Sequence, residues 1–134
     1  MRNTIIIICI IILVIVIYNY YQRNRSDVPV FYKKKLIRNY NARTVPPFGI
    51  FIKDSEKGNK DLLNHELVHW EQYRELGLLK YYGGYLTQMG KYGYDKMPME
   101  IEARGNESEY CKKNYTECVR SGVAKTIHNP KFRS

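Results

Sequence analysis

The sequence predicts a mainly helical α+β protein, in which a single N-terminal transmembrane helix precedes a small helical domain with one or two short strands. An uninterrupted apolar run from Thr4 to Ile17 predicts the first helix. Apolar residues recur at helical spacing after Asn59, and one short β-branched segment lies at Gly49–Lys53. The roughly 110 residues that follow the apolar run are enough for one compact domain.

The apolar run has the flanks of a membrane anchor. It contains no charge, and Tyr18, Tyr20 and Tyr21 follow it at once. A helical span needs about 20 residues, a length that the run reaches when these tyrosines are counted as an interfacial belt. No small-residue cleavage site follows, as it would in a secretory signal peptide. We therefore expect residues 1–21 to form an uncleaved single-pass anchor.

The charge distribution favours a lipid bilayer over a nucleic acid as a partner. The net charge is +9, but the basic residues are scattered and no basic-aromatic nucleic-acid motif is present. The densest basic group follows the apolar run, where anionic headgroups would attract it: Arg23, Arg25, Lys33, Lys34, Lys35 and Arg38. Only Arg2 precedes the run. The positive-inside rule then predicts that the C-terminal domain is cytoplasmic.

The remaining chain divides at changes of composition. Residues 22–45 are polar and basic and are predicted to form a juxtamembrane linker, which ends at Pro46-Pro47. Residues 46–122 are expected to form the domain, and residues 123–134 a tail without a strong pattern. Within the domain, Gly49–Lys53 is predicted to be a strand.

Three helices are expected after this strand. The first is capped by Asn59 or Asp61 and ends at Gly77, with a stripe formed by Leu62, Leu63, Leu67, Val68, Tyr73 and Leu76. The second covers Leu78–Tyr92 and is weakened at Gly83-Gly84. The third begins at Pro98 and runs to about Cys118. Core packing is the expected role of Trp70, Tyr73, Tyr81, Tyr82 and Tyr85.

The first of these helices carries the motif H-E-x-x-H, formed by His65, Glu66 and His69. Residues four apart lie on one face of a helix, so both imidazoles can bind one zinc ion. Glu66 is placed to act as a general base, because it can accept a proton from metal-activated water and pass it to a leaving amine. No C-x-x-C pair is present, which argues against a thiolate zinc site.

A catalytic zinc site needs a third protein ligand, and Glu100 is the leading candidate, followed by Glu102. The stretch Glu100-Ile101-Glu102-Ala103 resembles the E-x-x-A pattern of the gluzincin metallopeptidases. The motif with Gln72 added resembles the H-E-x-x-H-x-x-Q form of small members. The resemblance extends from about Pro47 to Glu107. It implies a zincin-like domain, Zn²⁺ bound by His65, His69 and Glu100, and a peptide or protein substrate.

Other roles stay open at this stage. Many gluzincins have Asp where this chain has Arg104, so Glu102, Glu107 or a backbone carbonyl must orient a histidine ligand. Gln72, Glu102 and Arg104 are candidates for supporting the ligands or contacting substrate. The candidates for donating a hydrogen bond to the oxyanion are Tyr92, Tyr94, Arg104 and His128. In the resembled fold an edge strand pairs with substrate, a role open to Gly49–Lys53.

The expected function is that of a membrane-anchored zinc metallopeptidase, a hydrolase. The alternative is a non-catalytic membrane protein with a structural zinc site, which a fourth protein ligand such as His128 would indicate. In a third interpretation the anchor itself is the active part and the domain is passive.

Overall fold

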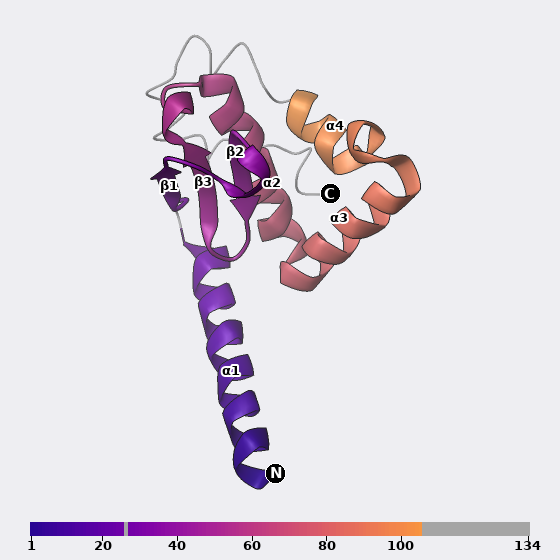
Figure 1. The fold of residues 1–134 in the computed structure, drawn as a ribbon. Helices are drawn as coiled ribbons and strands as arrows, with labels where there is room; N and C mark the ends of the chain where they lie inside the picture. Colours follow the sequence, from indigo (N-terminus) through magenta and orange to yellow (C-terminus); the bar gives the residue numbers. More distant parts are fainter. Residues whose placement is uncertain (26, 106–134) are drawn as a thin grey trace.

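The structure is a computed structural model that describes residues 1–25 and 27–105. It is mainly helical with one small sheet, as the sequence predicts (Figure 1). A long N-terminal helix projects from the domain like a stem. The elements in chain order are α1 (Arg2–Asn24), β1 (Val30–Lys33), η1 (Ile37–Asn39), β2 (Ala42–Val45), β3 (Gly49–Lys53), η2 (Asp54–Glu56), α2 (Lys60–Leu76), α3 (Leu78–Tyr92), η3 (Tyr94–Lys96) and α4 (Pro98–Gly105).

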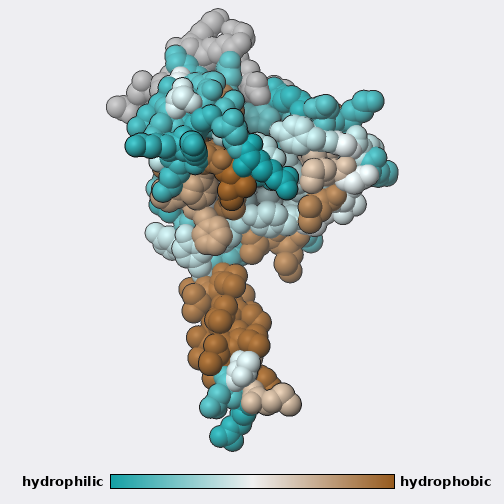
Figure 2. Space-filling model, viewed as in Figure 1, coloured by the Kyte–Doolittle hydropathy of each residue, from teal (hydrophilic) through white to brown (hydrophobic). Residues whose placement is uncertain are grey.

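Helix α1 is long and apolar enough to cross a membrane. No residue of its most apolar stretch is buried, so this stretch does not serve as a core helix of the described structure. Its apolar side chains form a continuous band along the stem (Figure 2). The helix does not stop at residue 21, where the anchor was expected to end. It continues to Asn24 and enters the domain.

The last turns of α1 are bonded to the domain. The Gln22 amide nitrogen donates to the carbonyl oxygens of Pro47, at 2.8 Å, and Phe48, at 3.3 Å. The Arg23 Nε donates to the carbonyl of Arg74 at 2.8 Å, and Tyr73 Oη donates to Asn19 Oδ1 at 2.6 Å. These bonds cross between segments far apart in the chain. Helix α1 therefore meets the domain through fixed contacts rather than through a flexible joint.

The sheet has three strands in the order β1-β3-β2, where one or two were expected. β1 pairs with β3 in parallel and β2 pairs with it antiparallel. Both outer strands lie within residues 22–45, the segment expected to be a linker. They are short, with sequences VFYK and ARTV, in which Val, Phe, Tyr and Thr favour strands but basic residues interrupt the pattern.

The strand order shows that the edge-strand role predicted for Gly49–Lys53 is wrong. β3, the Gly49–Lys53 strand, is the central strand, and Ile50 and Ile52 are buried in the core. β2 lies at the edge of the sheet and packs against α2. Lys33 pairs with Lys53 at the end of the sheet opposite Gly49, so the basic residues expected near the membrane do not all lie beside α1.

Helix α2 begins and ends as predicted. The Asn59 side chain accepts a hydrogen bond from the Leu62 backbone N–H, and Gly77 ends the helix with a φ of 81°. The helix is buried over most of its length, with Trp70 and Tyr73 in the core. It also buries a set of polar residues, namely Asn64, His65, Glu66, His69, Glu71 and Gln72. Buried polar groups on one helix need hydrogen-bond partners or a ligand, so these residues of α2 are candidates for a binding site.

The remaining helices follow the predicted pattern. α3 passes through Gly83-Gly84 without a break, and α4 starts at Pro98. The predicted extension of the third helix to Cys118 lies outside the described residues, as does the predicted tail. Tyr81 is a core residue as expected, Tyr85 is half-buried and packs against the core, and Tyr82 is exposed.

Replacing Gln22 with Ala should destabilise the domain. It would leave the Pro47 and Phe48 carbonyls without this donor, and such a loss costs about 1–3 kcal/mol. Thermal unfolding of the full chain in detergent should therefore occur several degrees lower. Asn24→Ala is the control, because the exposed Asn24 amide bonds only within α1, to the Tyr20 carbonyl at 2.8 Å. Equal melting of both variants and the parent would contradict the described docking.

Candidate metal centre

Three buried side chains from two helices converge on one point. His65 and His69 come from α2 and Glu100 from the first turn of α4. The two Nε2 atoms lie 3.2 Å apart. Glu100 Oε2 lies 3.1 Å from the His65 Nε2, and Glu100 Oε1 lies 3.2 Å from the His69 Nε2. These ligand atoms lie within 4.8 Å of one another, and the group could hold a metal ion.

The group fits a cation better than it fits a set of hydrogen bonds. Glu100 Oε2 is buried and makes no hydrogen bond of acceptable angle among the described residues, although His65 Nε2 is near it. Two imidazole nitrogens that face each other at 3.2 Å repel unless a proton or a cation lies between them. A cation at the shared point would satisfy all the converging lone pairs at once.

Gln72 fixes the tautomer of His69. Its Oε1 lies 2.9 Å from His69 Nδ1, and an amide oxygen can only accept. The amide is held in this orientation because its nitrogen donates to the Met99 carbonyl at 2.9 Å and to Glu102 Oε1 at 3.1 Å. His69 Nδ1 therefore carries the proton, and its Nε2 has a free lone pair for a metal.

Glu100 is 2% exposed and is held as a carboxylate. Burial raises its pKa, but the neighbouring imidazoles of His65 and His69 and the hydroxyl donated by Tyr85 outweigh burial, so the pKa lies well below the usual range. Tyr85 Oη donates to Glu100 Oε1 at 2.7 Å. Burial, and then this bond to Glu100, raise the pKa of Tyr85, so its hydroxyl keeps its proton at neutral pH. An ionised, oriented carboxylate is the form that binds a metal.

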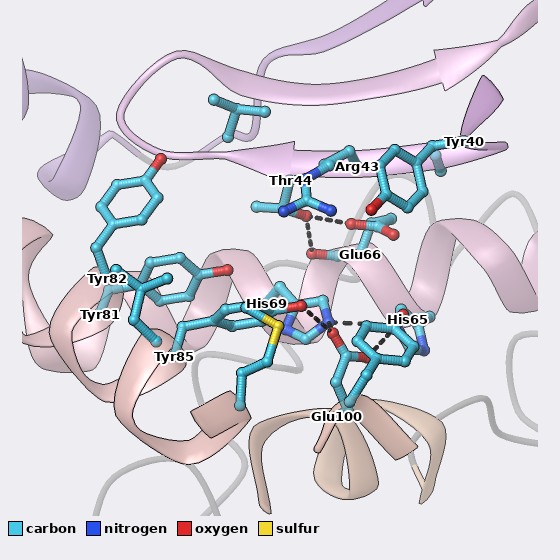
Figure 3. A pocket seen from close by; sticks show the side chains of 15 residues that line it. Tyr40, Arg43, Thr44, His65, Glu66, His69, Tyr81, Tyr82, Tyr85 and Glu100 are labelled. Atoms are coloured by element: carbon cyan, nitrogen blue, oxygen red, sulfur yellow. Dashed lines mark hydrogen bonds and ion pairs between the residues drawn. The ribbon is translucent and has the colours of Figure 1, made fainter. Parts of the chain in front are cut away.

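Glu66 lies on the same helix but is held by the sheet. Thr44 of β2 has its Oγ1 2.6 Å from Glu66 Oε2 and 2.9 Å from the Glu66 carbonyl oxygen. A hydroxyl has one proton to donate, and the shorter distance favours the carboxylate. Thr44 thus fixes one oxygen of Glu66. In Figure 3 the Glu66 carboxylate lies toward β2, away from the cluster of His65, His69 and Glu100.

A cavity of about 330 Å³ lies next to the metal group. β2 and Tyr40 form one wall, α3 another, and α2 the floor between them (Figure 3). Tyr40 and Arg43 line the strand side, and the Arg43 guanidinium lies 4.7 Å from the centre of the Tyr40 ring. Tyr82, Tyr85, Leu86 and Met89 line the α3 side. The group and Glu66 therefore face space that can admit a ligand.

The structure places some of the residues indicated by the sequence at the cavity and others away from it. His65, Glu66, His69 and Glu100 all line the cavity, whereas Glu102 and Arg104 do not. Glu102 supports Gln72 instead. Arg104 is exposed and donates to the Asp95 carbonyl, away from the group. Among the expected oxyanion donors, Tyr94 lines the cavity and Tyr92 does not.

Some predicted residues lie outside the described part of the chain, namely Glu107 and His128. Sequence reasoning missed Thr44, Arg43 and the bond from Tyr85 to Glu100. Tyr82 and Tyr85 were expected to pack in the core or between helices; Tyr85 does pack against the core, and both also line the cavity. The helical spacing of Tyr82, Tyr85, Leu86 and Met89 places them along one side of α3, but it does not show whether that side lines a cavity.

No protein-family model, curated protein sequence or solved structure matches the chain.

The choice between Glu100 and Glu102 as the third ligand can be tested with a matched pair of variants. Glu100→Gln should weaken divalent metal binding by roughly a hundredfold or more, because it removes a charged ligand. Glu102→Gln should cost less than about tenfold, because Glu102 acts only through Gln72. Titration of the full chain with Co²⁺, read from its visible spectrum, measures both. A larger loss at Glu102 would assign the ligand there.

Proposed function

We propose that the chain is a membrane-anchored zinc metallopeptidase of minimal gluzincin type. The observation that carries the proposal is that Glu100, from a separate helix, meets both histidines of the H-E-x-x-H motif beside an accessible cavity. Sequence spacing alone requires His65 and His69 to share a face. Nothing in that spacing requires a carboxylate from α4 to complete the set.

The donor set fits zinc. A tetrahedral Zn²⁺ with bonds of about 2.0–2.1 Å holds its ligand atoms about 3.3–3.4 Å apart. The two Nε2 atoms lie 3.2 Å apart, and each lies 3.1–3.2 Å from a different oxygen of Glu100. Two imidazoles and one carboxylate are also the ligands of one known class of catalytic zinc site, with the fourth position left open. When bound, zinc would supply Lewis-acid chemistry, lowering the pKa of a water molecule and polarising a substrate carbonyl.

Glu66 is the proposed general base. Its carboxylate would accept the proton of the attacking water on one oxygen and deliver it to the leaving amine. Thr44 bonds to Oε2, at 2.6 Å, which leaves Oε1 for this transfer. Glu66 is buried and its carboxylate is oriented by Thr44, so it occupies a defined position beside the cavity.

Tyr94 is the proposed donor to the developing oxyanion. It lies on the cavity wall, unlike Tyr92 and Arg104. Burial, followed by the negative charges of Glu100 and Glu66, raises the pKa of Tyr94 to about 12. Its hydroxyl therefore remains a hydrogen-bond donor at neutral pH.

An extended peptide is the proposed substrate. β2 lines the cavity and pairs with β3 on one side only among the described residues. Its outer edge can pair with an extended chain through backbone groups, which gives affinity with little sequence preference. This role belongs to Ala42–Val45 rather than to Gly49–Lys53, because the latter strand is central.

The proposed anchor is α1, retained in the mature protein. Removal of this helix as a signal sequence would also remove Gln22 and Arg23, which bond to the domain. The excess of basic residues after the apolar run supports a cytoplasmic domain by the positive-inside rule.

The alternative, a structural zinc site in a non-catalytic protein, needs a fourth protein ligand. The metal-binding group of the described residues has three members. Thr44 holding Glu66 beside the cavity favours the catalytic proposal, because a structural site has no use for that carboxylate.

Glu66→Gln should retain the metal and lose proteolysis. General acid–base catalysis contributes roughly a hundredfold to ten-thousandfold, and this is the expected loss of turnover. The measurement is cleavage of an unfolded protein by full-length, zinc-loaded enzyme in detergent, with metal content determined in parallel. Glu75→Gln is the control, because Glu75 is exposed and lies at the far end of the same helix. A zinc-loaded parent without peptidase activity would support the structural alternative instead.

Thr44→Val should lower kcat by about tenfold without loss of metal, because a hydrogen bond to a charged group contributes about 1.5–3 kcal/mol. Thr44→Ser keeps the hydroxyl and should restore most of the rate. The comparison of kcat, KM and zinc content across the three proteins tests whether Thr44 positions Glu66. If valine and serine had the same effect, packing rather than the hydroxyl would be responsible.

A further inference from the structure

The end of the domain that receives α1 carries exposed apolar side chains. Phe48, in the turn between β2 and β3, is 54% exposed. Leu76, the last residue of α2, is 41% exposed, and Leu79, in the first turn of α3, is 88% exposed. We call these three residues the underside. Figure 2 shows apolar side chains along the lower margin of the domain, next to the apolar stem.

Two contacts with α1 fix the position of Phe48 along this helix. Its ring centre lies 6.0 Å from that of Tyr18, the residue that directly follows the apolar run. Its carbonyl accepts from Gln22, one turn further along the helix. Phe48 therefore lies beside the α1 segment that would occupy the interfacial layer, if the apolar run spans the hydrocarbon.

Arg23 holds the end of α2, where Leu76 lies, against the last turns of α1, and Leu79 follows three residues later. The Arg23 side chain donates to the carbonyls of Arg74 and Glu75 at the end of α2. It also lies so close to Gly77 that a Cβ there would meet it at 3.3 Å. Leu76 directly precedes Gly77 and Leu79 follows it by two residues, so both are close in the chain to the point where Arg23 of α1 meets the domain.

We propose that the underside, Phe48, Leu76 and Leu79, inserts into the headgroup region of the same bilayer that α1 crosses. The domain then lies on the membrane instead of being displayed at a distance from it. Continuity between the apolar stem and the underside supports a lipid occupant over a separate protein partner. The charges nearby are mixed, with Lys80 and Glu75 both exposed, so the contact is apolar rather than electrostatic.

This placement fixes the height of the metal group, and this step rests on the proposed function. His69 precedes Leu76 by seven residues and His65 precedes it by eleven. At 1.5 Å per helical residue, His69 lies about 10 Å and His65 about 16 Å from Leu76 along α2. The metal group is therefore no farther than about 16 Å above the underside. A flexible chain of about seven residues has an end-to-end distance near 15 Å. The substrates are therefore segments of membrane proteins that lie several residues outside a transmembrane helix.

Depth measurements test the contact without reference to activity. Full-length Phe48→Trp and Leu79→Trp variants are placed in vesicles of lipids brominated near the headgroup, which quench nearby tryptophans. Ile101→Trp is the control, because Ile101 is 52% exposed on α4, on the side of the domain away from α1 (Figure 1). The buried Trp70 gives a background that is read from the parent and subtracted.

The two underside tryptophans should be quenched at least about threefold more strongly than the one at position 101, since tryptophan favours the interface. Equal quenching at the three positions would overturn the proposal. Protection of positions 48 and 79 from both brominated lipid and a water-soluble quencher would also overturn it, because protein would then cover the underside. Phe48→Trp keeps an aromatic ring and Leu79 is almost fully exposed, so each variant is an independent test.

Substrate reach gives a second readout. A single peptide sequence is attached to a transmembrane helix through a spacer of one, about seven or about thirty residues, and cleavage is followed in vesicles. The intermediate spacer should be cut fastest, with a loss of about tenfold at the longest, because effective concentration falls as the −3/2 power of length. Similar rates for all spacers would overturn the proposed reach. Failure to cut these and a soluble peptide would count against the proposed function, and the quenching result would still stand.

Discussion

Gln72 joins the two helices that carry the metal group. One end of its amide accepts from His69 of α2, and the other donates to the Met99 carbonyl and to Glu102 of α4. Met99 directly precedes Glu100, so this bond sets where the third carboxylate lies. Because the nitrogen end is occupied by acceptors, the oxygen must face His69. A single amide thereby fixes a tautomer, a helix contact and the position of Glu100.

This arrangement explains how the chain does without an aspartate at position 104. In the resembled family an acid after the E-x-x-A pattern orients a histidine, whereas Arg104 points elsewhere and bonds the Asp95 carbonyl. Gln72 orients His69 instead, from the helix of the histidine itself. Glu102 does not contact the histidine, but it accepts a hydrogen bond from the Gln72 amide nitrogen and so keeps the amide in this orientation. The departure at Arg104 therefore leaves the histidine oriented.

The part of the site that could be predicted is the part that a single helix determines. His65, Glu66 and His69 follow from helical spacing, whereas Glu100, on α4, was a candidate because its stretch resembles the E-x-x-A pattern. Thr44 could not be found in this way, because it lies on a four-residue strand whose approach to α2 depends on pairing with β3. Tyr85 was missed because a tyrosine-rich helix has the same spacing whether it packs in a core or lines a cavity.

The same distinction holds for the fold. The apolar run, the caps of α2 and the start of α4 are local signals and were confirmed. The segment 22–45 carries only short local signals for strands, at residues 30–32 and 44–45, and its basic composition favoured a linker. Its structure depends on contacts with distant residues, above all those of β3. The docking of α1 likewise depends on Gln22 and Arg23 meeting carbonyls that lie far along the chain.

The turn after β2 connects the site to the stem. Thr44 holds the Glu66 carboxylate, and four residues later Phe48 lies against Tyr18 of α1. Between them, the Pro46 and Pro47 carbonyls accept from Tyr82 on the cavity wall and from Gln22 of the stem. The short segment from Thr44 to Phe48 thus contacts the proposed base, the cavity wall and the helix that would enter the bilayer. A shift of α1 relative to the domain would move this segment, so the geometry around Glu66 is coupled to how the stem is seated.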